Sequence, residues 1–322
     1  MRFSMASIAA VLLACAAAPA VAQFKEGDPG GAKLGASHLQ KWQAGIVVVA
    51  QGGPCKGIIG YAPIPSEWPE QQIKVAQQDV SPGVHVTYQT VADSVRVMVV
   101  RMPTVPANQE AKALMTFEIT RNVQLLPEEK DRKAFELPDL KELDVSMRRY
   151  LTASPKIETR DAKIRKAAKE VGADKEKAWD RVEALYDWAR QKVKYKQGGA
   201  VKGAVAALRE GVGGHEDLAC LFIALCRAAD IPARTVWVPE FCYAEFYLVD
   251  AKGEGHWLPC QPAGARAFGE MPDTRPILQK GDNFQPPYNN RDRQRYLAEY
   301  LTGSPAQNGG KPRVQFVRQM VN

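Results

Sequence analysis

The fold is decided by the stretch GGHEDLACLFIALCRAADIPAR, residues 213–234. Within it, residues 218–229 are apolar almost all round, which is the pattern of a fully buried helix. Glu216 and Asp217 precede this run, where their charges complement the positive end of the helix dipole. Pro232 cannot continue a helix, and a strand is expected to begin near Arg234. We therefore predict a buried helix that leads directly into a strand.

Three strands are predicted after this helix. They are expected at Arg234–Val238, Tyr243–Val249 and Gly255–Pro262, with a turn at Asp250–Glu254 between the last two. A helix followed by antiparallel strands, rather than alternating strands and helices, implies an α+β architecture.

Amphipathic helices are predicted before this core. Apolar residues recur at helical spacing in two segments, namely Ile164, Ala167, Ala168 and Val171, and then Ala178, Val182, Leu185 and Ala189. We expect Asp174 to cap the second of these helices, and a further short helix to span Ala200–Glu210. In the tail we expect a helix near Arg291–Leu301 and a strand near Val314–Met320.

The N-terminal part of the chain has a β pattern. Apolar residues alternate with polar ones in several short segments, such as Val84, Val86 and Tyr88, then Val95, Val97 and Val99. Strands at this spacing predict a small β-sandwich-like domain over residues 38–140. A glycine-rich, flexible lead-in is expected at 23–37. The second domain is expected over 141–322, with its core at 174–262.

The first 22 residues have the pattern of a secretory signal peptide. Arg2 gives the positive start, residues 8–18 form a short apolar run, and Ala-Val-Ala at 20–22 is a small-x-small cleavage site before Gln23. We therefore expect a periplasmic or secreted protein. Two alternatives are an uncleaved membrane anchor, for which the run is short, and lipoprotein processing at Cys15. After residue 22, no stretch approaches the roughly 20 apolar residues that a membrane-spanning helix needs.

The chain after the signal would keep five cysteines, which are Cys55, Cys220, Cys226, Cys242 and Cys260. An odd number in an oxidising compartment leaves at least one thiol free, unless it pairs with another chain. Cys220 and Cys226 are expected to point to different faces of the buried helix and not to bridge each other. Packing in the core is the common role of such cysteines.

The formal net charge is +7. Lysines and arginines are dense between Lys156 and Lys196, but acids are interleaved with them, which is typical of a solvated helical face. Export argues against nucleic acid as a partner, whereas an anionic cell-envelope surface stays open. Neither His-x-x-x-His nor Cys-x-x-Cys occurs in the sequence, so we expect no metal and no cofactor.

Three pieces of sequence occur in a recognisable order around the predicted core. Residues 213–217, GGHED, open the buried helix, and residues 231–234, IPAR, begin the next strand. The following strands contain YAE at 243–245 and WLPCQ at 257–261. This order resembles the transglutaminase-like superfamily, which shares its core with papain-like cysteine proteases. The resemblance implies a transglutaminase-like domain preceded by the β domain.

The family's chemistry uses three side chains on this frame. A cysteine at the helix start becomes a thiolate, which the helix N-terminus favours. A histidine on the facing strand takes its proton, and an aspartate on the next strand orients the imidazole. In this sequence the three positions fall on His215, Phe241 and Gln261, so all three chemical roles are altered.

Three other sources of catalytic activity are a nucleophilic or basic His215, a bound metal ion and a cysteine elsewhere in the site. His215 at a helix start would tend to be neutral and has no orienting partner. The neighbours Glu216 and Asp217 cannot close on one metal ion with it, because adjacent helix residues do not face one another. A relocated thiol at Cys242 or Cys260 should point away from the family's site. We therefore name no confident catalytic residue.

The leading hypothesis is a catalytically inactive transglutaminase-like protein that binds a peptide or protein partner or serves as a scaffold. The candidate binding residues are Glu245, Tyr243 and Trp257. The alternative is a thiol-dependent amidase, peptidase or protein-glutamine acyltransferase with an unconventional site. If the alignment with the family is right, His215 lies at a helix N-terminus and faces Phe241 and Gln261 within about 8 Å.

Overall fold

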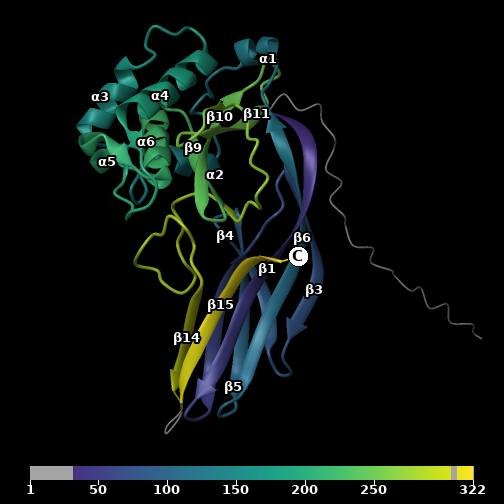
Figure 1. Ribbon diagram of the computed structural model, residues 1–322. Helices are drawn as coiled ribbons and strands as arrows, with labels where there is room; N and C mark the ends of the chain where they lie inside the picture. The colour runs from purple at the N-terminus through teal and green to yellow at the C-terminus, as the bar shows by residue number, and fades with distance from the viewer. Residues whose placement is uncertain (1–31, 306–309, 322) are drawn as a thin grey trace, which may run out of the picture.

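The computed structural model describes residues 32–305 and 310–321. The predicted signal peptide at 1–22 lies outside the described residues. Figure 1 shows a long β region at the bottom of the view and a region that contains the helices above it. In the described part of the chain, no helix is long and apolar enough to cross a membrane.

Two four-stranded antiparallel sheets form the β region. Their strands are β1 (Lys33–Gln51), β2 (Cys55–Ile64), β3 (Gln71–Val80), β4 (His85–Val91), β5 (Val95–Val105), β6 (Glu110–Leu125), β14 (Tyr300–Pro305) and β15 (Lys311–Val321). The strand orders are β15-β1-β6-β3 and β14-β2-β5-β4. The two sheets bury one common core, which contains Ile46, Ile58, Met98 and Phe117. We call this region the sandwich.

The sandwich begins earlier in the chain than the sequence predicts. Residues 33–37 were expected to belong to the flexible lead-in, but they lie in β1, where Lys33 pairs with Leu125 and Ser37 with Asn122. The lead-in expectation is therefore wrong for these residues. The long partner strand β6, rather than the local glycine content, decides their conformation.

The tail of the chain returns to the sandwich. The predicted strand at 314–320 lies within β15, which pairs with β1, and β14 pairs with β2. The predicted helix at 291–301 is wrong: this segment is irregular and enters β14. The side chain of Gln279 binds the backbone N–H and carbonyl of Leu297 at 2.9 and 2.8 Å. The side chain of Gln279 thus supplies hydrogen-bond partners for the backbone N–H and C=O of Leu297, which a helix would otherwise supply.

The second region combines six helices with a five-stranded sheet. The helices are α1 (Glu129–Ala134), α2 (Val145–Arg148), α3 (Ala162–Glu170), α4 (Ala178–Lys192), α5 (Ala204–Glu210) and α6 (His215–Ala228), and a 3₁₀ turn spans Arg149–Leu151. The sheet has the order β12-β11-β10-β9-β13. Its strands are β9 (Ala233–Val238), β10 (Phe241–Val249), β11 (Gly255–Gln261), β12 (Ala267–Phe268) and β13 (Gln279–Lys280). The predicted buried helix and the three antiparallel strands after it are confirmed.

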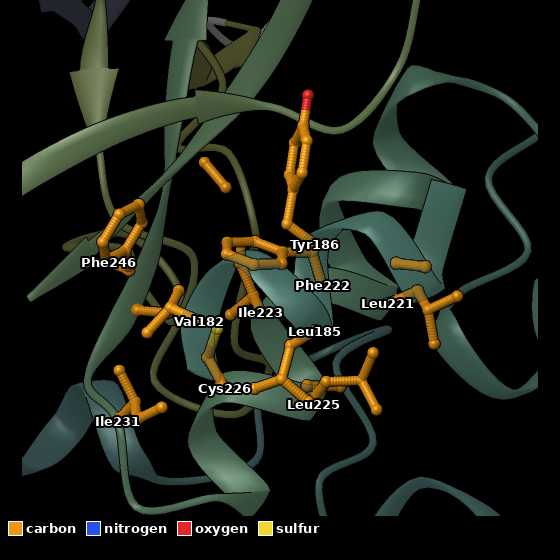
Figure 2. Close-up of a cluster of buried hydrophobic side chains, with 14 of the residues drawn as sticks. Val182, Leu185, Tyr186, Leu221, Phe222, Ile223, Leu225, Cys226, Ile231 and Phe246 are labelled. Atoms are coloured by element: carbon orange, nitrogen blue, oxygen red, sulfur yellow. The ribbon is translucent and has the colours of Figure 1, made fainter. Parts of the chain in front are cut away.

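Helix α6 is the centre of this region. Every residue from Asp217 to Arg227 is buried. Figure 2 shows Phe222 and Cys226 of α6 among side chains of α4, such as Val182 and Leu185, with Phe246 of β10 beside them. The helix is therefore covered on all sides, as its uniformly apolar sequence indicates.

Two helix starts differ from the prediction. Asp174 does not cap α4, which begins at Ala178 after Lys177, and the Asp174 carboxylate pairs with Lys175 instead. Helix α5 begins at Ala204 rather than at residue 200. The preceding Gly203 has a φ of +100°, a conformation that favours glycine and cannot belong to a helix.

Candidate functional site

The N-terminus of α6 is fixed by a side chain in its first turn. The Asp217 carboxylate accepts hydrogen bonds from the backbone N–H of Gly214 at 2.9 Å, Lys202 at 2.7 Å and Gly203 at 3.0 Å. Asp217 is only 2% exposed. Its carboxylate therefore ties the chain before α5 to the start of α6 and is not available as a metal ligand.

His215 is the first residue of α6, as predicted, and it meets Phe241 at the start of β10. The centroids of the two rings are 4.8 Å apart, with 31° between the ring planes. Burial lowers the pKa of the half-buried imidazole below its ordinary value, and the nearby charge of Arg275 acts in the same direction. The Arg275 guanidinium lies 5.2 Å from the centroid of Phe241. A half-buried imidazole, a phenyl ring and a guanidinium thus pack together at the start of α6.

Gln261 is the last residue of β11, and its hydrogen bonds are formed with residues other than His215 and Phe241. Its side-chain amide donates to the carbonyl of Ala265 at 3.2 Å, and its backbone carbonyl accepts from the hydroxyl of Tyr186 at 2.8 Å. In the described part of the chain, no hydrogen bond or ring contact joins Gln261 to His215 or Phe241. The structure thus brings two of the three predicted positions into contact, and the approach of Gln261 stays a prediction.

The other first-turn acid of α6 binds an arginine from a distant loop. Glu216 accepts from the Nη1 of Arg295 at 2.6 Å, and the guanidinium of Arg295 lies 5.2 Å from the Trp237 ring. Glu216 and Asp217 therefore have separate partners, as expected for neighbours on a helix.

All five described cysteines are free and buried. Burial raises the pKa of each thiol, to about 12 for Cys220. Cys242 packs with Ala219 and Trp237 and so faces α6 on the opposite side of β10 from Tyr243. The thiols are thus held in the protonated form, which is the unreactive one.

Glu245 and Tyr243, two of the candidate binding residues, lie on the side of β10 that faces the sandwich. Both are fully buried. The Glu245 carboxylate binds Arg234 Nε at 2.7 Å and Lys280 Nζ at 2.5 Å, and Lys280 also binds Glu70 of the sandwich at 2.6 Å. We call these four residues the ion network.

The ion network determines the charge of Glu245. Burial alone would raise the pKa of this carboxyl, but the charges of Arg234 and Lys280 outweigh burial and hold the pKa below its ordinary value. The Arg234 guanidinium also lies 3.9 Å from the ring centroid of Trp257, the third candidate binding residue. What the structure shows for these residues is a junction between the sheet and the sandwich. Their role in ligand binding stays a prediction.

Sequence reasoning did not find the partners in this junction. Lys280 and Glu70 are more than 200 residues apart in the chain. Tyr243 accepts a hydrogen bond at 3.3 Å from Arg121, which comes from β6 and is also fully buried. A glutamate inside an apolar strand indicates that some cation must pair with it, but the sequence does not say which one.

Two other places could hold a ligand, and neither is at the start of α6. In the turn between β10 and β11, side-chain atoms of Asp250, Glu254 and His256 lie within 4.8 Å of one another; Asp250 also accepts the backbone N–H groups of that turn. An open cavity of about 760 Å³ is lined by residues within 89–93, 145–149 and 283–293, between the β4–β5 turn and α2.

Comparisons with known proteins bear on the fold. A family model described as the transglutaminase-like superfamily matches residues 165–262. The search of curated proteins gave no match. The solved structure of a candidate cysteine protease from Cytophaga hutchinsonii aligns with a TM-score of 0.57 and 17% identity, over 90% of this chain and 93% of that chain.

A candidate protease from Parabacteroides distasonis aligns with a TM-score of 0.27 and 13% identity, over 66% of this chain and 47% of that chain, and supports no structural conclusion. At 17% identity, the first likeness shows a shared fold and not a shared activity. Together with the buried helix and the strands that follow it, the family match identifies residues 165–262 as a transglutaminase-like domain with a papain-like fold.

Proposed function

We propose that this protein is exported, lacks the acyl-transfer chemistry of the transglutaminase-like superfamily, and binds an extended peptide beside the start of α6. The observation that carries the proposal is the stack of His215 on Phe241, with ring centroids 4.8 Å apart. The sequence match to the family assigns the positions of the thiol and its base to these two residues, which supports the proposal. Export rests on the signal-peptide pattern of residues 1–22.

The proposed loss of acyl-transfer chemistry follows from the chemical properties of the His215 and Phe241 side chains. Acyl transfer needs a nucleophile, a base within hydrogen-bond reach and a group that orients the base. The phenyl ring of Phe241 can neither accept the proton of a nucleophile nor orient an imidazole. The buried, protonated thiols offer no replacement.

A peptide can bind without acyl-transfer chemistry, because binding depends on apolar rings and backbone N–H groups and needs no nucleophile or base. His215 and Phe241 are both partly exposed, so the stack has a side open to solvent. Apolar rings beside a helix N-terminus suit a peptide, whose side chains can pack on the rings while its carbonyls and carboxylates approach the N–H groups of the first turn.

Thiol labelling of the native protein tests the loss of chemistry. We expect each of the five cysteines to react with a maleimide only as fast as unfolding exposes it. The variant His215→Cys is the positive control, because a thiol at this helix start should have a lowered pKa and react within seconds to minutes. One native cysteine that reacts fast, and whose replacement abolishes a measured amidase activity on glutamine peptides, would instead establish the thiol-dependent enzyme.

A further inference from the structure

The positive charge of the chain is concentrated next to the candidate site. Residues 188–209 contain six lysines and arginines and no acid, although the chain as a whole has 43 basic and 36 acidic residues. This segment runs from the end of α4 through β7 (Lys194–Tyr195) into α5. We call it the basic segment.

Some of its cations have partners. Lys202 and Arg209 bind Glu210 at 2.6 and 3.3 Å, and Arg190 donates to the carbonyls of residues 261, 262 and 264. Lys194 and Lys196 are exposed, and within the described residues neither forms an ion pair. These two ammonium groups are available to an anionic ligand.

Lys194 is the first residue of the short strand β7, which lies beside α6, and Lys196 follows directly after this strand. Strand β7 pairs in parallel with β8 (Val212–Gly213), and the backbone N–H of Lys196 donates to the carbonyl of Gly213 at 2.8 Å. The carbonyl oxygens of Lys196 and Gly198 lie 3.9 Å from the position that a Cβ on Gly214 would take. The basic segment therefore passes directly beside the residue that precedes His215.

No strand of the described residues pairs with the outer edge of β7. The sheet that contains β7 has only one other strand, β8, in the described part of the chain, so the second edge of β7 can pair with an added strand. Tyr195, between the two lysines, is 40% exposed and offers a ring for packing. Across the site, Arg275 packs on Phe241, but its charge is paired with Asp273; the α6 N-terminus contributes partial positive charge.

We infer that the ligand of this site is an extended peptide rich in acidic side chains, bound along the edge of β7 that faces away from β8 and continuing toward the His215–Phe241 stack. The inference rests on the proposed function and adds the charge class of the peptide. A strand edge favours a peptide, because a peptide backbone has the N–H and C=O groups that pair with it. Lys194 and Lys196 then select carboxylates on alternate residues, since side chains two apart in a strand share a face.

The test compares three fluorescent peptides of one length, in which Thr alternates with Glu, Gln or Lys, by fluorescence anisotropy at low and high salt. We expect the Glu peptide to bind the full-length mature protein at least about tenfold more tightly than the Gln peptide at low salt, and the difference to shrink as salt rises. The Lys peptide should bind most weakly.

Matched variants test whether Lys194 and Lys196 cause the preference for the Glu peptide. Lys194→Gln/Lys196→Gln should weaken Glu-peptide binding about five- to tenfold and leave Gln-peptide binding within about twofold. The control Lys56→Gln/Lys74→Gln removes the same charge from exposed positions on the sandwich and should change neither by more than about twofold.

The possible failures are distinct. Equal affinity for the Glu and Gln peptides would overturn the acidic preference and leave the proposed peptide binding intact. Absence of binding to all three peptides would overturn the proposed peptide binding itself. Displacement of the Glu peptide by duplex DNA or by phosphatidylglycerol vesicles, at lower charge concentration than unlabelled Glu peptide, would show a general polyanion surface and overturn the inference.

Discussion

Two positions on β10, Glu245 and Phe241, differ in the interactions that hold them. At Glu245, four charged side chains from three distant parts of the chain are paired with one another, and none is more than 9% exposed. At Phe241, the contact with α6 is a ring stack with one half-buried, neutral imidazole. Loss of Lys280 or Glu245, the two central members of the ion network, leaves a buried charge without its ion-pair partner, whereas we expect the contact at Phe241 to change with a smaller loss of packing.

This difference accounts for which parts of the family pattern are present. Arg234 and Glu245 match the pattern and belong to the ion network, where they join the sheet to the sandwich. His215 and Phe241 depart from the pattern at a place where the fold requires little. If the proposed loss of chemistry holds, the fold of the domain does not depend on its catalytic positions, and stability measurements can test this.

The largest effect is expected from Lys280→Met. The change removes the ion-pair partner of the buried Glu70 carboxylate and leaves Glu245 with Arg234, and breaking a buried ion pair in this way typically costs about 3–5 kcal/mol. Urea denaturation followed by tryptophan fluorescence measures the loss in the free energy of unfolding.

The matched control is Lys133→Met. Lys133 pairs with Glu129 on the surface, with both side chains about 70% exposed, so its loss should cost under about 0.5 kcal/mol. Equal effects of the two changes would show that the ion network is no more important to the fold than a surface pair, and the contrast between the two positions on β10 would be wrong.

A smaller effect is expected from Tyr243→Phe. The change removes only the hydroxyl that accepts a hydrogen bond from the buried guanidinium of Arg121. Hydrogen bonds to charged groups contribute about 1.5–3 kcal/mol, and Arg121 keeps its contact with Gln124, so we expect a loss near the lower figure. In the control Tyr88→Phe, the ring is 41% exposed and stability should stay within about 0.5 kcal/mol.

The sequence predicts one of these two positions on β10 much better than the other. The apolar run before Arg227 and the proline at 232 predict α6 and β9, and the alignment places His215 opposite Phe241. The ion network could not be predicted, because Glu70 and Lys280 reach Glu245 only through the packing of the sandwich on the sheet. The tail helix was wrong for a related reason: the side chain of Gln279 satisfies the backbone at Leu297.

A further reduction in effect is expected for Phe241→Leu, which keeps an apolar side chain against the neighbouring core residues and removes only the ring contacts. The ring is only partly buried and contacts His215 and Arg275, and such ring contacts contribute about 0.5–1.5 kcal/mol. We expect a loss of about 1 kcal/mol in the free energy of unfolding, together with weaker peptide binding. A loss as large as that of Lys280→Met would show that the stack is part of the structural frame.

The smallest effect is a dependence on pH that originates at His215. Burial lowers the pKa of its imidazole in the folded protein, from an ordinary value near 6.5. As the pH falls below about 6.5, the unfolded chain takes up a proton at this residue before the folded protein does, so the free energy of unfolding decreases.

His215→Gln removes this contribution. Between about pH 7 and 5 the variant should therefore lose less stability than the native protein, by under about 1 kcal/mol. The other titrating groups are common to both proteins and cancel in the difference. Denaturation curves at several pH values measure it, and NMR titration of the His215 ring gives the pKa directly. A pKa above 6.5 would mean that the folded protein favours the charged imidazole, and the expected direction of the pH dependence would be wrong.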